Sequence, residues 1–343
     1  MTTMRTGLKQ LLALPRRVVS KSQEPRAKSQ EHRALNMLGA VLAALAQLHL
    51  LADGPADLPT PKPKAASVSF ADIGLVEFET PADPKLVIRY TLNGSAPKAD
   101  SYAYCTPIRV ASSLKLKAAC FGADGKSGPA VEIACVRNSG LQKDSSGKLK
   151  GAINVDFSEC PDLADWAKRA QKDAEEEYPA IAERLASEGF TPPRQAMLIF
   201  KKDTKVQIAA TGGDKITFNR AWIDSHPKDT GTVIHELAHV IQAYKGRNPG
   251  WLVEGIADYI RWWIWEPPER RRLPNPARFK YTNSYQDTAA FLYWAEKQYD
   301  KDLVHKLNKH CRGNSYKDEL FKEFTGKDLD TLSKEFAESL TKK

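Results

Sequence analysis

The sequence predicts a multidomain protein, with an N-terminal all-β sandwich followed by an α+β domain. Short runs of alternating apolar and polar residues, broken by Gly, Asn, Asp and Pro, extend from Phe70 to about Val136, which is the pattern of a small antiparallel sandwich. Later in the chain, strand-like runs come first and segments with helical periodicity follow. Residues 138–150 in between are polar and contain Gly140 and Gly147, so we expect a linker there.

The amino-terminal segment differs in charge from the rest of the chain. The 343 residues carry a formal charge of +9; residues 1–36, with eight Lys or Arg against two Asp or Glu, contribute +6, which leaves +3 for the rest. A nearly neutral remainder needs no polyanionic partner, so we expect no binding to nucleic acid. The basic segment runs into Ala34–Ala52, an apolar stretch rich in Leu and Ala. We therefore expect residues 1–56 to be an export signal and leader, and the protein to be secreted, periplasmic or at the cell surface.

Two alternatives exist for this apolar stretch. A retained signal-anchor would keep the protein at the membrane, but Gln47 and His49 shorten the run below the ~20 apolar residues that a stable anchor needs. A buried helix of a soluble protein is the other alternative. No other stretch is apolar enough to cross a bilayer, so we expect membrane contact only through the signal segment.

The predicted sandwich, residues 68–137, rests on strand and turn signals. Arg89–Leu92 runs into an Asn93–Gly94 turn, and Leu114–Phe121 is followed by a turn at Gly122–Ser127. This pair resembles the chitobiase/β-hexosaminidase C-terminal type of immunoglobulin-like module. The resemblance implies an immunoglobulin-like β-sandwich that is accessory to a secreted enzyme and has no catalysis of its own. It could bind cell-wall glycan or another surface, or it could be a spacer.

The second domain, residues 151–343, is predicted to begin with strands and end with helices. The expected strands are Gln195–Phe200, Lys205–Ala210 and, after Gly212 and Gly213, Lys215–Asn219. Helical periodicity marks Leu163–Ser187 and the stretch from Lys317 onward. Strands followed by helices indicate an α+β domain.

The run His235-Glu236-Leu237-Ala238-His239 carries the strongest functional signal. The two histidines are four residues apart, so on a helix both imidazoles project from one face and can hold one metal ion. Glu236 lies beside the first histidine, where it can take a proton from a metal-bound water. The segment is apolar along one side and ends at a turn, Lys245–Gly250, that contains Gly and Pro. The alternative is a surface helix with two incidental histidines.

A second helix is expected to begin near Trp251 and to carry Glu254 and Asp258, again four residues apart on one face. After a reversal of the chain, that face can meet the two histidines. Glu254 would complete a His, His, Glu set and leave the fourth position for water, as in catalytic zinc sites. Asp258 would accept a hydrogen bond from the far nitrogen of a ligand histidine. A third histidine six residues after His239 is excluded because Lys245 stands there, and a solvated helix face is the alternative for the carboxylate pair.

These residues lie within a longer resemblance. The segments His235–Gln242, Trp251–Arg261 and Ser284–Leu292 resemble the basic secretory protein family, a group of secreted zinc peptidases of the gluzincin type found in plants and bacteria. The resemblance covers residues 150–340. It implies a zincin-like metallopeptidase domain with Zn2+ held by His235, His239 and Glu254 and with Glu236 as the general base.

The resemblance also implies how a substrate is bound. In zincins a strand at the sheet edge pairs with extended substrate, and Ile216–Trp222 is our candidate for that edge, with an ordinary interior strand as the alternative. Tyr285 is the candidate donor to the developing oxyanion because it lies in a family-like segment, with plain packing as the alternative. The expected partner is a peptide or protein substrate. The Gly-x-Met-Glu-Asn signature of zinc aminopeptidases is absent, which favours an endopeptidase.

The expected function is therefore hydrolysis of peptide bonds through a zinc-bound water, with Glu236 as the general base. The alternative is a non-enzymatic cell-wall or glycan-binding protein with a structural metal site. Glu236 argues against this alternative, because a structural site has no use for a base beside an open coordination position.

Two further sequence features are the cysteines and a cluster of tryptophans. Five cysteines, at positions 105, 120, 135, 160 and 311, allow two disulfides at most, such as Cys160–Cys311 with one pair among the other three; buried free thiols are the alternative. The aromatic cluster Trp262–Trp265 is expected in the core, with the lining of a substrate cleft as the alternative.

Overall fold

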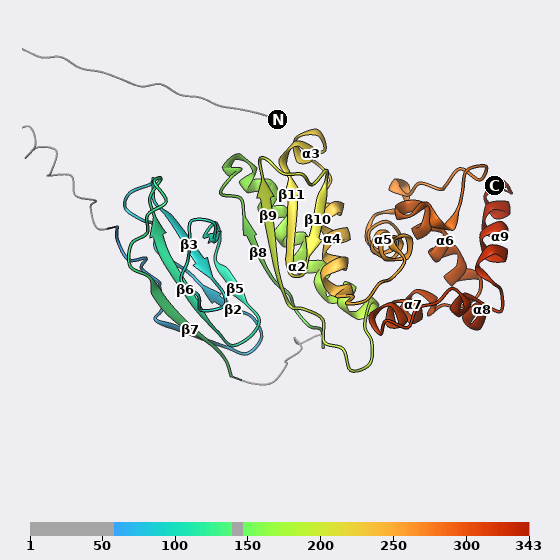
Figure 1. Cartoon of the computed structure of the whole chain (residues 1–343), viewed down its shortest axis with the longest axis horizontal. Helices are drawn as coiled ribbons and strands as arrows, with labels where there is room; N and C mark the ends of the chain where they lie inside the picture. Colours follow the sequence, from blue (N-terminus) through green and yellow to red (C-terminus); the bar gives the residue numbers. More distant parts are fainter. Residues whose placement is uncertain (1–57, 139–146, 343) are drawn as a thin grey trace, which may run out of the picture. The chain divides into compact units, whose positions relative to one another are not determined.

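The computed structural model describes residues 58–138 and 147–342, with a sheet-rich N-terminal region followed by a helical C-terminal part (Figure 1). This order agrees with the prediction. All described residues belong to one unit of the fold. The predicted leader, residues 1–56, and most of the predicted linker, residues 138–150, lie outside the described residues. Within the described part, no helix has the length and apolarity that crossing a bilayer requires.

The N-terminal region consists of two sheets that share one core. A five-stranded sheet has the order β1 (Ser67–Phe70), β7 (Val131–Arg137), β6 (Leu114–Phe121), β3 (Val87–Thr91) and β4 (Tyr102–Ala103), and β2 (Gly74–Val76) pairs with β5 (Ile108–Val110). These pairs are antiparallel except β1 with β7. Val76 and Ile108 of the small sheet are buried in one cluster with Tyr90, Leu116 and Ile133 of the large one. The predicted alternation thus directs apolar side chains into a common core.

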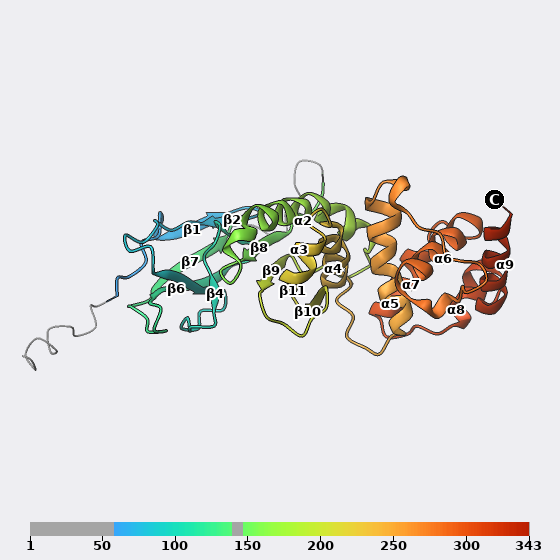
Figure 2. The ribbon, with the colours of Figure 1, turned by 90° about the horizontal axis from the view of Figure 1, so that it is seen from above.

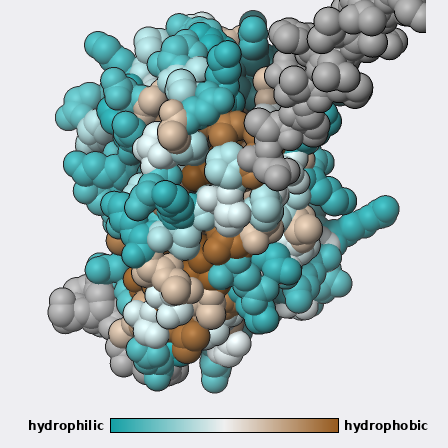
Figure 3. Space-filling view, turned by 90° about the vertical axis from the view of Figure 1, so that its left-hand side faces the viewer, coloured by the Kyte–Doolittle hydropathy of each residue, from teal (hydrophilic) through white to brown (hydrophobic). Residues whose placement is uncertain are grey.

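The outer surface of this region is mainly hydrophilic. The side of the molecule drawn in Figure 3 carries apolar residues in patches that hydrophilic residues separate. The large apolar side chains of the region that are exposed, Leu75, Val87 and Val136, come from three different strands. Scattered exposure of this kind is ordinary for a protein surface.

After the N-terminal region the chain forms a four-stranded sheet, called the second sheet below. Its order is β10 (Ala209–Gly212), β11 (Lys215–Asn219), β9 (Gln195–Lys201) and β8 (Ala152–Asp156). β8, β9 and β11 run parallel, and β10 joins β11 antiparallel through a tight turn in which Gly213 has a φ of +64°. The strands predicted at Gln195–Phe200 and Lys215–Asn219 are confirmed. The bounds predicted for Lys205–Ala210 are wrong, because pairing with β11 begins only at Ala209 and continues to Gly212.

The substrate edge predicted at Ile216–Trp222 is wrong. Its strand, β11, has β10 on one side and β9 on the other, and the chain then forms helix α3 (Arg220–Ser225). The hairpin through Gly213 adds β10 outside β11. Among the described strands, β10 therefore forms the edge on the side of α4, because it pairs with β11 alone, and β8 forms the opposite edge.

Helices cover one face of the second sheet. α2 (Ala164–Arg184) and α4 (Gly231–Gln242) pack against each other on that face (Figures 1 and 2). Leu198 and Phe200 of β9 point into the core shared with these helices, whereas Met197 packs in the core of the N-terminal region. β8 is buried along its whole length, although its apolar Ile153 and Val155 alternate with the polar Asn154 and Asp156. Ile153 and Val155 pack in the core shared with the helices.

Polar contacts hold the N-terminal region against the other face of this sheet. The side chain of Asn154 accepts a hydrogen bond from the backbone N–H of Arg109 at 2.8 Å and donates to its carbonyl at 3.0 Å. The carboxylate of Asp156 accepts from the backbone N–H of Ala103 at 2.9 Å. Asn154 is 1% exposed, so its side chain is buried between the two parts. Together with Met197, these contacts join the N-terminal region to the second sheet.

The remaining elements are mostly helical. They are η1 (Pro161–Leu163), α5 (Gly250–Asp258), the π-helical turn η2 (Tyr259–Trp265), η3 (Pro268–Arg270), η4 (Tyr281–Asn283), α6 (Tyr285–Gln298), α7 (Leu303–Arg312), α8 (Glu319–Thr325) and α9 (Leu329–Thr341). The helices predicted within Leu163–Ser187, near Trp251 and from Lys317 onward are confirmed.

The five cysteines all lie in the described part of the chain and are free thiols. The disulfide considered between Cys160 and Cys311 is not formed. Both thiols are buried, and Cys160 lies 3.7 Å from the carbonyl oxygen of Phe200.

Candidate metal centre

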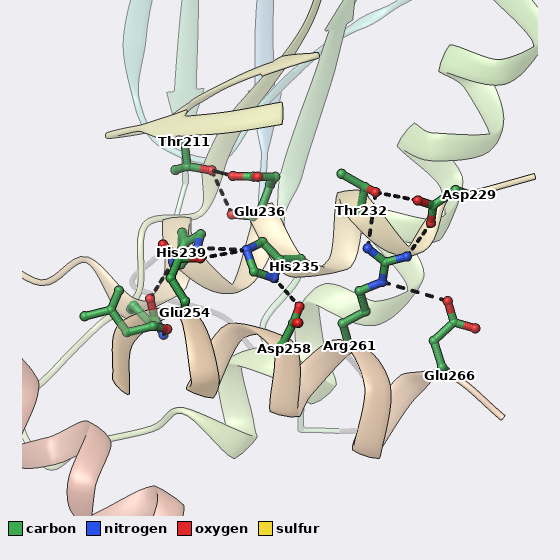
Figure 4. Close-up of polar contacts among 12 residues, drawn as sticks. Thr211, Asp229, Thr232, His235, Glu236, His239, Glu254, Asp258, Arg261 and Glu266 are labelled. Carbon is green, nitrogen blue, oxygen red and sulfur yellow. Dashed lines mark hydrogen bonds and ion pairs between the residues drawn. The ribbon is translucent and has the colours of Figure 1, made fainter. Parts of the chain in front are cut away.

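Helix α4 presents the two motif histidines to a cleft. Its apolar residues, Val233, Ile234, Leu237, Val240 and Ile241, are buried in the core that the four-stranded sheet shares with its helices. The helix ends at Gln242; the next residue, Ala243, has a left-handed φ of 45°, and the chain then turns back into α5. This reversal places Glu254 and Asp258 across from the histidines (Figure 4).

Three ligand atoms converge at one point. Nε2 of His235 lies 3.1 Å from Nε2 of His239, and Oε2 of Glu254 lies 3.2 Å from the first nitrogen and 3.3 Å from the second. A tetrahedral zinc ion with bonds of about 2.0–2.1 Å holds its ligand atoms about 3.3 Å apart. The three atoms therefore have the spacing of one face of such a site, and all three residues line the cleft.

The far nitrogen of each histidine is held by an oxygen. Nδ1 of His235 lies 2.7 Å from Oδ1 of Asp258, as the sequence predicts. Nδ1 of His239 lies 2.8 Å from Oε1 of Gln242. The amide nitrogen of Gln242 donates to the carbonyl of Val253 at 3.1 Å, which identifies the atom facing His239 as the oxygen. Both imidazoles thus donate from Nδ1 and direct Nε2 toward Glu254.

This hydrogen-bond pattern suits a cation. In a neutral imidazole that donates from Nδ1, Nε2 carries a lone pair, so two nitrogens and one carboxylate oxygen face one another. A cation or a proton must lie between lone pairs that are this close. Burial lowers the pKa of His235, but hydrogen bonds to Asp258 and Glu254 outweigh it and raise that pKa to about 10. Burial raises the pKa of Glu254, whereas hydrogen bonds from His235 and His239 lower it to about 2. The donor set therefore fits a divalent cation.

Glu236 lies between this cluster and the sheet edge (Figure 4). Its Oε2 accepts a hydrogen bond from Oγ1 of Thr211 at 2.6 Å, and Thr211 belongs to β10. Glu236 is 5% exposed and lines the same cleft as the cluster. The carboxylate is therefore fixed to the edge strand and faces the space in front of the cluster.

Tyr285 lies at the rim of the cleft, in strained backbone at the start of α6. Ser284 and Tyr285 have φ values of 69° and 47°, a region that residues with a Cβ seldom adopt. Tyr285 is 55% exposed, and its ring centroid lies 6.1 Å from that of His235. The charge of Glu254, followed by burial, raises the pKa of the Tyr285 hydroxyl, which is therefore protonated and a hydrogen-bond donor at neutral pH. This exposure argues against the packing alternative.

The cleft has a volume of about 1730 Å³ and runs along β10. Ala209, Ala210 and Thr211 line it from the edge strand, and Ile208 lines it just before this strand begins. Of the predicted tryptophan cluster, Trp262 lines the cleft, whereas Trp263 and Trp265 pack against the core. Two of the three tryptophans thus pack against the core, as expected, and the third lines the cleft, which was the alternative.

Two residues of the site, Gln242 and Thr211, are not among those that the sequence predicts. Gln242 follows His239 by three positions, so the helical spacing that pairs the histidines could have found it. Thr211 has no such signal, because its hydrogen bond to Glu236 depends on how β10 packs against α4.

Comparison with known proteins agrees with both resemblances drawn from the sequence. Residues 167–336 match the BSP family, described as peptidase of plants and bacteria, and residues 66–132 match the chitobiase/beta-hexosaminidase C-terminal domain. No curated protein and no solved structure matches the chain. The first match contains the His, His, Glu cluster and Glu236, and it supports a peptidase.

Proposed function

We propose that this chain, whose residues 167–336 match a family of peptidases, is an exported zinc metallopeptidase of the gluzincin type that acts as an endopeptidase. His235, His239 and Glu254 would hold the zinc, and Glu236 would be the general base. One observation carries the proposal: two imidazole nitrogens and one carboxylate oxygen, 3.1, 3.2 and 3.3 Å apart, converge in a cleft that Glu236 also lines.

Zinc suits this donor set of two imidazoles and one carboxylate. Asp258 and Gln242 support it, since each holds one histidine in the tautomer that binds a metal through Nε2. When bound, zinc supplies a Lewis acid that polarises the scissile carbonyl and makes water more acidic.

Glu236 accepts the proton of the attacking water and passes it to the leaving amine. The hydrogen bond from Thr211 supports this role, because it fixes one carboxylate oxygen and leaves the other to exchange the proton. Tyr285 donates a hydrogen bond to the oxyanion that develops on the scissile carbonyl. Its position at the rim and the raised pKa of its hydroxyl support that role.

A peptide substrate would bind as an added strand on β10. The support is that β10 pairs with β11 alone among the described strands and that Ile208–Thr211 line the cleft. Backbone hydrogen bonds to such an edge hold a peptide extended and largely independent of its sequence. The scissile bond would then lie in front of Glu236 and the cluster.

The other parts of the chain have proposed roles as well. Residues 151–343 would form the zincin-like peptidase domain, and residues 68–137 an immunoglobulin-like module. The match of residues 66–132 supports an accessory module that binds cell-wall glycan. Residues 1–56 would direct export and be removed, so that the mature protein is secreted, periplasmic or at the cell surface.

The test is the substitution Glu236→Gln. Glutamine keeps the size of the side chain and can still bond Thr211, but it cannot accept the proton. Cleavage of a peptide library should fall by at least the ~10²–10⁴-fold that general-base catalysis supplies, while the zinc content stays the same. The exposed Lys245→Ala serves as the control and should keep both. If wild type and Glu236→Gln cleave equally, or neither cleaves with zinc bound, the non-enzymatic glycan-binding protein becomes the better account.

A further inference from the structure

The charged residues that line the cleft are unevenly distributed. All of its lysines and arginines come from two segments: Lys228 precedes α4, and Arg261, Arg270, Arg271 and Arg272 belong to η2 and the chain after it. The two segments meet at the N-terminal end of α4, where Arg261 forms an ion pair with Asp229 and donates to Oγ1 of Thr232 at 3.3 Å (Figure 4). We call the part of the cleft lined by Lys228 and residues 261–272 the basic end.

Two of these five cations are already neutralised. Arg261 is paired with Asp229, and Nη1 of Arg270 lies 2.8 Å from Oε2 of Glu266. The side chains of Asp229 and Glu266 are 18% and 1% exposed, so both pairs belong to the wall of the cleft. They hold the wall together and contribute little net charge to the space inside.

Three cations at the basic end have no carboxylate partner among the described residues. Lys228 and Arg272 are exposed, and no hydrogen bond or ion pair ties either of them to another described residue. Arg271 donates from Nε to the carbonyl of Trp262 at 3.0 Å and from Nη2 to that of Trp263 at 3.2 Å. Carbonyl oxygens orient this guanidinium without cancelling its charge. Glu269 is the remaining carboxylate at this end, so the positive charge is in excess.

The other end of the cleft differs. At the C-terminal end of α4 the lining residues Gln242, Ala243, Tyr244 and Val253 are uncharged, and Asp214, in the turn between β10 and β11, is an acidic lining residue. The metal cluster, on His235 and His239, lies between the two ends of the helix. A peptide that follows β10 past the cluster would therefore have positive charge on one side of its scissile bond and no lining lysine or arginine on the other.

We propose that the basic end binds a carboxylate of the substrate, so that the enzyme favours peptides with Asp or Glu to one side of the cleaved bond. This inference rests on the proposed function and names the substrate class of the same cleft. Low-dielectric walls focus the field of Lys228, Arg271 and Arg272 into the cleft, which attracts an anionic side chain. The same field disfavours Lys or Arg there, so it excludes substrates as well as selecting them. A free C-terminal carboxylate offers the same chemistry as an acidic side chain.

The test uses the full-length zinc-loaded protein and pairs of end-blocked peptides that differ only in Glu against Gln at one position. The position is moved through both sides of the cleaved bond, and a third arm compares neutral peptides with free and amidated C-termini. The variants are Arg272→Glu and the double variant Lys228→Glu/Arg272→Glu. Lys334→Glu is the matched control, because it makes the same charge change as Lys228→Glu on the exposed surface of α9, outside the cleft.

In wild type and Lys334→Glu we expect kcat/KM to favour Glu over Gln by about twofold to fivefold on one side of the bond, as exposed ion pairs allow, and high salt to reduce this preference. The double variant should lose or reverse it. A preference confined to the third arm would identify the C-terminal carboxylate as the group bound. Equal rates for all pairs, or a preference that the double variant keeps, would overturn the inference.

Failure of the peptidase proposal is distinguishable from failure of this one. If wild type cleaves no peptide, binding of the same fluorescent pairs to the zinc-loaded Glu236→Gln protein is measured by anisotropy. The Glu peptide should bind more tightly than the Gln peptide, and this difference should disappear when Lys228→Glu and Arg272→Glu are added to Glu236→Gln. That result would support the basic end, although the peptidase proposal fails. Cleavage by wild type with equal use of Glu and Gln peptides supports the peptidase and rejects the basic end.

Discussion

Nδ1 of His239 lies 2.8 Å from Oε1 of Gln242, one turn further along the same helix. The amide nitrogen of Gln242 donates in turn to the carbonyl of Val253 in α5, at 3.1 Å. One side chain therefore orients a ligand histidine and joins the helix of the two histidines to the helix of Glu254. Since Gln242 is 1% exposed, water cannot easily replace it.

Gln242→Leu should weaken zinc binding by about 10–100-fold, as the loss of a group that orients a metal ligand usually does. Competition with a chromogenic chelator measures the affinity. Gln171→Leu is a matched control, because Gln171 is also buried and donates to a backbone carbonyl, that of Ile153, at 2.7 Å. The control should lower thermal stability and leave the zinc affinity unchanged. An unchanged affinity in Gln242→Leu would show that Gln242 does not position His239.

Glu254 and Asp258 should differ in their effect on metal content. Glu254→Ala removes an atom that converges with both imidazoles, so the purified variant should retain little zinc after dialysis. Asp258→Ala removes only the partner of Nδ1 of His235, so zinc should be retained with affinity reduced by about 10–100-fold. Metal quantification after dialysis decides between them, and full zinc in Glu254→Ala would remove this residue from the ligand set.

Zinc binding should release protons at pH 7. The pKa of His235 in the metal-free protein is about 10, so its imidazole carries an extra proton at neutral pH, which a metal must displace from Nε2. Because the pKa is raised, this proton is bound below about pH 10 and absent above it, so metal binding at pH 7 releases it. Calorimetric titration in buffers of different ionisation enthalpy should therefore show about one proton released per zinc ion from this residue. Heats that do not depend on the buffer would contradict this.

The N-terminal region and the second sheet should unfold together. Met197 of β9 packs in the core of the N-terminal region, and the side chain of Asn154 in β8 forms two hydrogen bonds with the backbone of Arg109. Met197→Ala should lower the free energy of unfolding by about 2–5 kcal/mol, as the removal of buried methylene groups does. Differential scanning calorimetry should show one transition that moves as a whole. Val136→Ala, at a position that is 45% exposed, should change the free energy of unfolding by less than about 0.5 kcal/mol. Two separate transitions, of which only one responds to Met197→Ala, would refute the coupling.

The sequence by itself determined the features that depend on neighbours along the chain. Four-residue spacing on a helix is sufficient to place His235 and His239 on one face, and the same spacing pairs Glu254 with Asp258. The Gly- and Pro-containing turn between the helices indicated the reversal that lets the two faces meet. Strands such as Lys215–Asn219 were also predicted with their bounds, because a turn signal and alternating side chains are local properties.

Only the tertiary structure decided which strand forms the sheet edge and what the sheet is packed against. β10 is the edge rather than β11 because strand order results from pairing between distant segments, which periodicity does not encode. Thr211 reaches Glu236 for the same reason, since the contact exists only once β10 lies on α4. The burial of β8 was also decided by the tertiary structure: Asn154 and Asp156, which alternate with Ile153 and Val155, have the pattern of a solvent-facing side, but both bind backbone N–H groups of the N-terminal region and are buried.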